Sequence, residues 1–144
     1  MACTMGQNKG KRGEREIAKI LQTAIDEVYD GLELEGCRPS ISRNLNQARS
    51  GGFDLAGLPW LAPEVKRQEQ LNINGWWKQT TRQAEAAGAE PVLLYKQNHK
   101  KWQVVTLVTM PLPDGKRIRL RATLSLDDWL FYFKEQIKRR LNSD

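Results

Sequence analysis

Residues 53–66 read FDLAGLPWLAPEVK and hold two short apolar runs, one on each side of Pro59. Proline marks a tight connection here, so we expect residues 53–58 and 62–66 to pair as an antiparallel hairpin. Pro63 has no N–H to donate to a ladder, which places it at a strand start or on a sheet edge. The stretch therefore predicts a β-hairpin near the middle of the chain.

The hairpin would bring two carboxylates and a lysine together. Side chains alternate faces along a strand, so Glu64 and Lys66 share one face while Val65 points to the core. If the hairpin turns symmetrically about Pro59, Asp54 lies opposite Glu64, with Cβ atoms roughly 5 Å apart. Two carboxylates this close repel each other, and a bound Mg²⁺ would offset that repulsion because it takes oxygen ligands. A cross-strand ion pair of Lys66 with either carboxylate is the alternative.

The first helix is predicted from near Gly13 to near Gly31. Its buried stripe is formed by apolar residues at helical spacing, namely Ile17, Ile20, Leu21, Ala24, Ile25 and Val28. Residues 1–12 show no apolar period, and their glycines and basic residues are typical of a flexible basic arm. We therefore expect an arm over residues 1–12 and a single domain over residues 13–144.

The rest of the chain alternates strands and helices. We expect an edge strand within residues 40–44, followed by a helix over 74–87 with an Asn74 N-cap and a stop at Gly88. A strand over 91–96, buried on both faces, should come next. The chain should then form a hairpin of 102–110 and 116–122 around Pro113-Asp114-Gly115, and end in an amphipathic helix with Ser125 as its N-cap. This order predicts one α/β layer domain.

The composition favours an intracellular protein with a polyanionic partner. The 144 residues include 23 Lys and Arg against 17 Asp and Glu, a net charge of +6 with a pI near 9.5. Such a surplus favours phosphate contacts, although a solvated basic surface has the same composition. No apolar run reaches the roughly 20 residues of a membrane helix, and the N-terminus does not resemble a secretory signal. Two isolated cysteines predict neither a disulfide framework nor a zinc site.

Glu14 has two interpretations. It lies three and four residues before Ile17 and Ala18, so it extends the buried stripe of the first helix. A carboxylate on that side needs a partner, and the proposed metal site supplies one. Acidic residues also favour the first turn of a helix, where they complement the macrodipole. This explains Glu16 well, and it explains Glu14 about as well as the metal site does.

Three runs of the sequence together resemble the PD-(D/E)XK nucleases. They are Lys11-Arg12-Gly13-Glu14-Arg15-Glu16, Gly52-Phe53-Asp54-Leu55 and Pro63-Glu64-Val65-Lys66. Within that superfamily the chain is most similar to archaeal-type Holliday junction resolvases and their viral relatives, over about residues 9–96. The aspartate follows Phe53 rather than proline. The resemblance implies a restriction-endonuclease-like core, with a central mixed sheet flanked by helices. Residues after about 100 do not match and add a C-terminal hairpin and helix.

The resemblance also implies residue roles. Asp54 and Glu64 would bind Mg²⁺, which Mn²⁺ can replace, and Glu14 would contact the metal directly or through water. Lys66 would be the catalytic lysine, and Gln79 or Gln83 would support it. DNA-binding candidates are Lys11, Arg12, Arg15, Arg43, Arg49 and Arg67.

The added hairpin offers further basic residues. Arg117, Arg119 and Arg121 alternate with apolar residues, so one strand face carries three guanidinium groups about 7 Å apart. They can follow a phosphate backbone, or they can protect an exposed strand edge. Trp76 and Trp77 favour packing over base stacking.

The implied function is Mg²⁺-dependent resolution of four-way DNA junctions by a homodimer, with recognition through shape and phosphates. A viral origin inside a host cell fits this resemblance. Two alternatives stay open: another endonuclease of the superfamily, of restriction or replication-repair type, and a DNA-binding module without catalysis.

Overall fold

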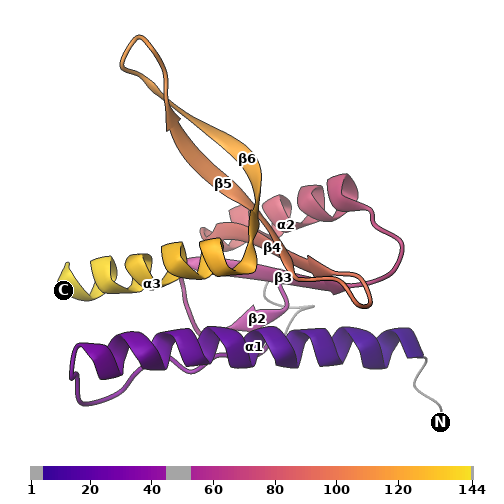
Figure 1. Ribbon diagram of the computed structural model, residues 1–144, viewed down its shortest axis with the longest axis horizontal. Helices are drawn as coiled ribbons and strands as arrows, with labels where there is room; N and C mark the ends of the chain where they lie inside the picture. The colour runs from indigo at the N-terminus through magenta and orange to yellow at the C-terminus, as the bar shows by residue number, and fades with distance from the viewer. Residues whose placement is uncertain (1–4, 45–52, 144) are drawn as a thin grey trace.

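The computed structural model describes residues 5–44 and 53–143 and contains a four-stranded mixed sheet with helices on both faces (Figure 1). The sheet order is β3-β4-β5-β6. Its main elements are α1 (Met5–Gly31), β3 (Leu61–Arg67), α2 (Ile73–Ala87), β4 (Glu90–Lys96), β5 (Gln103–Pro111), β6 (Arg117–Ser125) and α3 (Leu126–Asn142). The expected mixed α/β architecture, with an additional C-terminal hairpin and helix, is confirmed.

Alternate residues of β4 fill two separate cores. Val92 and Leu94 belong to the larger core, which α1 and α3 cover, whereas Leu93 joins Trp76 of α2 and Val105 in the smaller one. All three β4 side chains are fully buried. The expectation of a strand buried on both faces is thus confirmed, and such a strand belongs at the centre of a layered sheet.

The sheet is parallel at one edge and antiparallel beyond it. β3 pairs with β4 in parallel, with Glu64 beside Leu93 and Lys66 beside Tyr95, and α2 makes the crossover. β4 pairs with β5 and β5 with β6 in antiparallel ladders. Pro63 lies in the edge strand, as expected for a residue that cannot donate a ladder hydrogen bond.

The predicted hairpin of residues 53–58 with 62–66 is wrong as a strand pairing. β2 (Leu55–Ala56) pairs with β1 (Ser42–Arg43) in a separate two-stranded sheet. Gly57, at φ +137°, ends β2 by turning the chain against Ser40, and β3 takes its ladder partners from β4. The expected edge strand within residues 40–44 is confirmed as β1.

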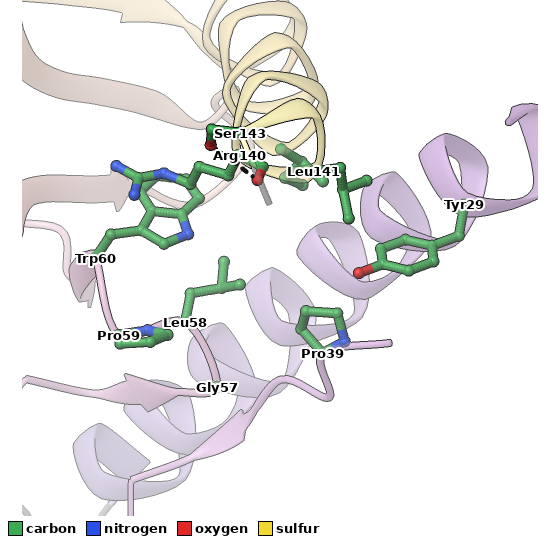
Figure 2. Close-up of a pocket in the computed structure, with 10 residues that line it drawn as sticks. Tyr29, Pro39, Gly57, Leu58, Pro59, Trp60, Arg140, Leu141 and Ser143 are labelled. Atoms are coloured by element: carbon green, nitrogen blue, oxygen red, sulfur yellow. Dashed lines mark hydrogen bonds between the residues drawn. The ribbon is translucent and has the colours of Figure 1, made fainter. Parts of the chain in front are cut away.

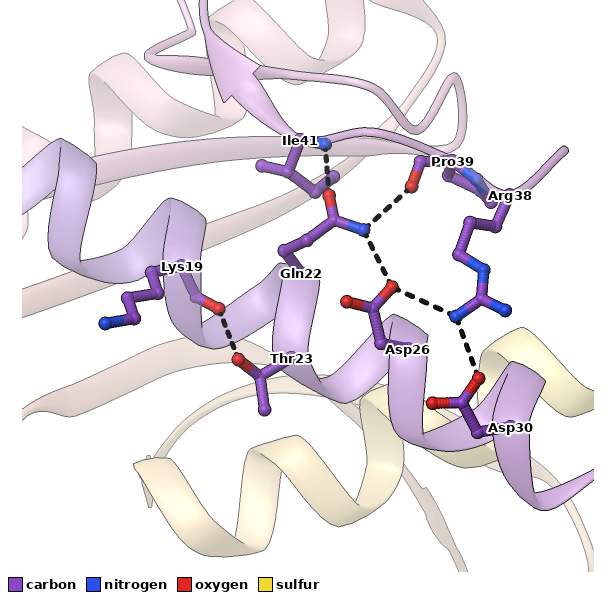
Figure 3. A network of polar contacts seen from close by, with 8 residues as sticks. All are labelled: Lys19, Gln22, Thr23, Asp26, Asp30, Arg38, Pro39 and Ile41. Carbon is purple, nitrogen blue, oxygen red and sulfur yellow. Dashed lines mark hydrogen bonds and ion pairs between the residues drawn. The ribbon is translucent and has the colours of Figure 1, made fainter.

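A polar network fastens the segment before β1 to α1 (Figure 3). Gln22 contacts the segment twice: its Nε2 donates to the Pro39 carbonyl at 3.1 Å, and its Oε1 accepts from the Ile41 N–H at 2.8 Å. Arg38 donates to Asp26 and Asp30 at 3.3 Å and 3.1 Å. These contacts fix where the chain enters β1, and hence where Arg43 lies.

Two helices start earlier than predicted. α1 begins at Met5 instead of near Gly13, so residues 5–12 of the expected arm are helical; residues with good helix propensity there outweigh two glycines. The N-cap of α2 is Asn72 rather than Asn74, because Asn72 accepts from the Gly75 N–H and lets Ile73 pack on the smaller core. Gly88 ends α2 in the left-handed conformation, as expected.

The C-terminal elements follow the sequence closely. β5 and β6 form the predicted hairpin, which projects from the body (Figure 1). Ser125 caps α3, and the α3 side chains of Trp129, Phe133 and Ile137 are buried against α1. Trp76 is buried against Tyr95, so the packing interpretation of that tryptophan is confirmed. Within the described residues, no helix combines the length and apolar composition needed to cross a bilayer.

Replacing Gly57 by alanine should destabilise the fold by about 1–3 kcal/mol. An added Cβ would lie 2.4 Å from the Ser40 carbonyl oxygen, at a φ that L-residues rarely adopt. Chemical denaturation measures the loss. Gly31→Ala is the control, because its Cβ meets nothing within 4 Å. Equal stability of the two variants would show that the Gly57 turn is not strained by a side chain.

Candidate active site

The alternation of side chains along β3 places Glu64 and Lys66 on the same face of the strand, as the sequence predicts. Val65 is buried in the larger core beside α1, whereas Glu64 and Lys66 lie on the opposite face of β3. The Lys66 Nζ is 3.7 Å from Glu64 Oε1, and the two side chains are 20% and 4% exposed. Since β3 is a sheet edge, this face is bordered by α2 on one side and by the β2–β3 connection on the other.

Asp54 is fixed beside β3 by hydrogen bonds to that strand and to the residue that follows β1. Its N–H donates to the Pro63 carbonyl at 2.9 Å, and its carbonyl accepts from the Asn44 N–H at 2.8 Å. Its carboxylate Oδ2 accepts from the Val65 N–H at 2.7 Å. The side chain is therefore buried next to Glu64, although the strands that carry the two residues do not form the expected ladder.

Burial raises the pKa of both carboxyl groups. Burial raises the pKa of Glu64 to about 8, helped by the charge of Asp54, while the Lys66 ammonium acts in the opposite direction. Burial likewise raises the pKa of Asp54 to about 6, against the lowering effect of the Val65 N–H. The pair therefore retains a proton near neutral pH, the expected result for two carboxylates that share a desolvated site.

Glu14 reaches the same region from α1. Its carboxylate accepts a hydrogen bond from Arg43 Nε at 2.6 Å and is 14% exposed. Its charge also raises the pKa of Asp54, which shows that it lies within electrostatic range of the pair. α1 and β1 thus contribute an ion pair beside the two buried carboxylates. The partner that the structure gives Glu14 is Arg43, and contact of Glu14 with a metal stays a prediction.

The donor set fits a hard divalent cation. Glu64 Oε2 is buried without a hydrogen-bond partner among the residues that the structure describes, an arrangement that costs free energy unless a ligand binds there. Across residues 5–44 and 53–143, no group of three or more His, Cys, Asp or Glu side chains is arranged to hold a metal. Mg²⁺ commonly uses only one or two carboxylates and completes its coordination with water and substrate phosphate.

The other basic candidates divide into two groups. Lys11, Arg12 and Arg15 are exposed on the N-terminal part of α1. Arg67 is instead half-buried, with Nη1 3.6 Å from Glu16 Oε2. It therefore anchors β3 to α1, and its availability to DNA stays a prediction. Arg49 lies outside the described residues.

The arginines of β6 do not join the carboxylates. β6 is the far edge of the sheet, three strand spacings or roughly 14 Å from β3. Arg121 donates to Asn74 of α2 at 3.0 Å. Arg117 and Arg119 line a groove of about 540 Å³ that also contains Tyr132 and Arg139 of α3. On α2, Gln79 is exposed, and Gln83 has a buried Oε1 without a hydrogen-bond partner in the described part of the chain.

A second hollow lies away from the carboxylates (Figure 2). It measures about 330 Å³ and is lined by Tyr29 of α1, the turn after β2 and the end of α3. The Arg140 guanidinium lies 4.3 Å from the Trp60 ring centroid. Tyr29 follows Glu14 by fifteen residues, or roughly 22 Å of helix, so this hollow is separate from the candidate site.

One contributor could not be found from the sequence. Asn44 donates its backbone N–H to the Asp54 carbonyl and its side-chain Nδ2 to the Phe53 carbonyl at 2.9 Å. Its partners are backbone atoms nine and ten residues away, and no local pattern identifies them. Asn44 therefore shares in holding Asp54, although only Arg43 of this segment was a candidate.

Two buried carboxylates and a lysine at the edge of a mixed sheet define the PD-(D/E)XK class of nucleases. Residues 5–119 match the family described as "Phage putative PDDEXK endonuclease", and the chain belongs to that family.

Two individual proteins are also similar. Protein D14 of Escherichia phage T5 is 25% identical over 138 residues, which cover 85% of this chain and 83% of that protein. Among solved structures, the Hjc Holliday junction resolvase of Archaeoglobus fulgidus, an archaeal hyperthermophile, has a TM-score of 0.49 at 18% sequence identity, covering 85% of this chain and 95% of that one. The family match confirms the expected resemblance to PD-(D/E)XK nucleases.

Without a divalent cation, stability should fall as pH rises from about 4 to about 8. The pKa values of Asp54 and Glu64 are raised, so over this range the folded state binds more protons than the unfolded state, and deprotonation favours unfolding. Urea denaturation in EDTA at about pH 5 and about pH 8 should show a smaller decrease for Glu64→Gln than for wild type.

Glu85→Gln is the control for this comparison, because Glu85 is exposed on α2. It should keep the pH dependence of the wild type. If Glu64→Gln also keeps it, the Glu64 carboxyl does not hold its proton in the folded protein.

Proposed function

We propose that this protein is a Mg²⁺-dependent, structure-selective DNA endonuclease that resolves four-way junctions as a homodimer. The observation that carries the proposal is the buried Asp54–Glu64 pair beside Lys66, in a chain that belongs to a phage endonuclease family. Buried like charges are otherwise unfavourable, so the site is arranged for a cation. The preference for junctions and the dimer are supported by the sequence resemblance to resolvases.

Each residue of the site has a distinct part in this proposal. Asp54 and Glu64 would hold Mg²⁺, which, when bound, polarises the phosphodiester and activates water. The Val65 N–H holds Asp54 Oδ2, so this carboxylate keeps its orientation when substrate enters. Lys66 places a positive charge beside Glu64, where it can stabilise the pentavalent transition state or orient the attacking water.

The charge of the surface suits a DNA backbone. The net charge is +6, and Lys11, Arg12 and Arg15 are exposed on the helix that also carries Glu14. Arg43 beside Glu14 is a further phosphate contact in this proposal. Recognition would depend on phosphate positions and on substrate shape, with little reading of base edges. A phage-encoded enzyme of this kind would act inside the host cell.

Asp54→Asn should abolish cleavage and leave DNA binding intact. The amide keeps the shape of the side chain and removes the charge that would bind Mg²⁺. We expect labelled four-way junctions to be nicked symmetrically by the wild type with Mg²⁺ and left uncut with EDTA or by the variant. Binding measured with Ca²⁺ should be similar for both proteins. Asp114→Asn, at an exposed position in the β5–β6 turn, is the control and should cut normally.

The same assay with duplex and single-stranded DNA separates the alternatives. Equal cutting of linear duplex would favour another endonuclease of the superfamily over a resolvase. Binding without cleavage of any substrate would show a silent DNA-binding module. Full activity of Asp54→Asn would refute the site itself.

A further inference from the structure

A cationic hollow lies at the end of the sheet where the parallel strands β3 and β4 terminate. It measures about 410 Å³ and is formed by the end of β4, the β4–β5 loop and the start of α3. Its lining includes Lys96, Lys100 and Lys101, whose three ammonium groups outnumber the single carboxylate, that of Asp127. Lys100 and Lys101 are exposed, and among the described residues no ion pair engages any of the three lysines.

The sheet register brings this hollow close to the candidate active site. Lys66 lies beside Tyr95, and the next pair in the ladder is Arg67 with Lys96. Because strands are about 4.8 Å apart and residues about 3.3 Å, the backbones at Lys66 and Lys96 are separated by roughly 6 Å. Lys96 shares the face of its ladder partner Arg67, opposite to that of Lys66, so the hollow and the catalytic lysine lie on the two faces of the sheet at the same end. The Lys66 and Lys96 backbones are about two nucleotide rises of 3.4 Å apart at that point.

Trp102 joins the hollow to the basic end of α1. Its Nε1 donates to Glu16 Oε1 at 3.0 Å, and a Cβ added at Gly13 would lie 3.5 Å from its ring. The β4–β5 loop therefore lies beside the helix segment that carries the exposed Lys11 and Arg12, at one end of the molecule (Figure 1). The basic residues of the β4–β5 loop and of α1 therefore lie at the same end of the molecule.

We propose that Lys96, Lys100 and Lys101 form a binding site for the DNA phosphates that flank the cleaved one. This rests on the proposed endonuclease function and identifies where the substrate backbone leaves the active site. A compact ammonium group binds phosphate as a point charge and needs no fixed geometry, which suits exposed lysines on a loop. The DNA strand would pass over the end of the sheet where β3 and β4 terminate, from Lys66 toward the N-terminus of α3. These lysines position the substrate and do not act on the reacting atoms.

The test is the salt dependence of binding in a variant without the loop charges. Lys100→Gln/Lys101→Gln removes two exposed ammonium groups, and both side chains can change without disturbing the core. Binding of labelled duplex and junction DNA in Ca²⁺ is measured from about 50 mM to about 200 mM salt. The slope of log K against log salt should fall in magnitude by about two, so that affinity changes roughly tenfold less over this range. In cleavage assays the loss of affinity should appear as a higher KM for DNA.

Lys134→Gln/Lys138→Gln is the matched control. It removes the same charge from α3, where the lysines are paired with Glu27 and Glu135, and it should keep the wild-type slope. If the wild type cuts DNA but the loop variant keeps its slope, or if both variants lose slope equally, the lysine site is refuted and the endonuclease proposal stands. If the wild type cuts no DNA, the proposed function itself fails.

Discussion

The hydrogen bonds of Asp54 hold the rest of the site in place. This residue joins the two sheets, because its N–H donates to the Pro63 carbonyl of β3 and its carbonyl accepts from Asn44, the residue that follows β1. With its carboxylate held by the Val65 N–H, Asp54 cannot move away from Glu64. The raised pKa values follow from that constraint, since two carboxyl groups are kept close in a site that excludes water.

Holding the two carboxylates together costs folding free energy when no cation is bound, and it provides the ligands that a cation-dependent reaction needs. Desolvating a charge costs several kcal/mol, and Lys66 and the neighbouring Arg43 only partly compensate for two carboxylates and Glu14. Functional sites commonly hold groups in unfavourable surroundings that the rest of the fold stabilises. Here the two cores on either side of β4 and the Gln22 contacts before β1 provide that stability.

Local patterns predicted the parts of the site that depend on one segment. The alternation of Glu64, Val65 and Lys66 gave the correct faces of β3, and the closing helix behind Ser125 was correct as well. The closeness of Asp54 to Glu64 was also expected, but for a wrong reason, because β2 pairs with β1 and β3 pairs with β4. Strand partners depend on distant segments, as does the Trp102 bond to Glu16 across 86 residues. These long-range contacts cannot be predicted from a local sequence pattern.

In the proposed enzyme, the Asp54–Glu64 pair gives up its proton to bind a divalent cation. Titration calorimetry with Mn²⁺ at about pH 7, in two buffers of different ionisation enthalpy, measures both affinity and protons released. We predict that the wild type releases about one proton for each ion bound, and that Glu64→Gln binds more weakly and releases fewer. Absence of Mn²⁺ binding to the wild type, or equal affinity and proton release in the two proteins, would show that the carboxyl pair is not a cation site.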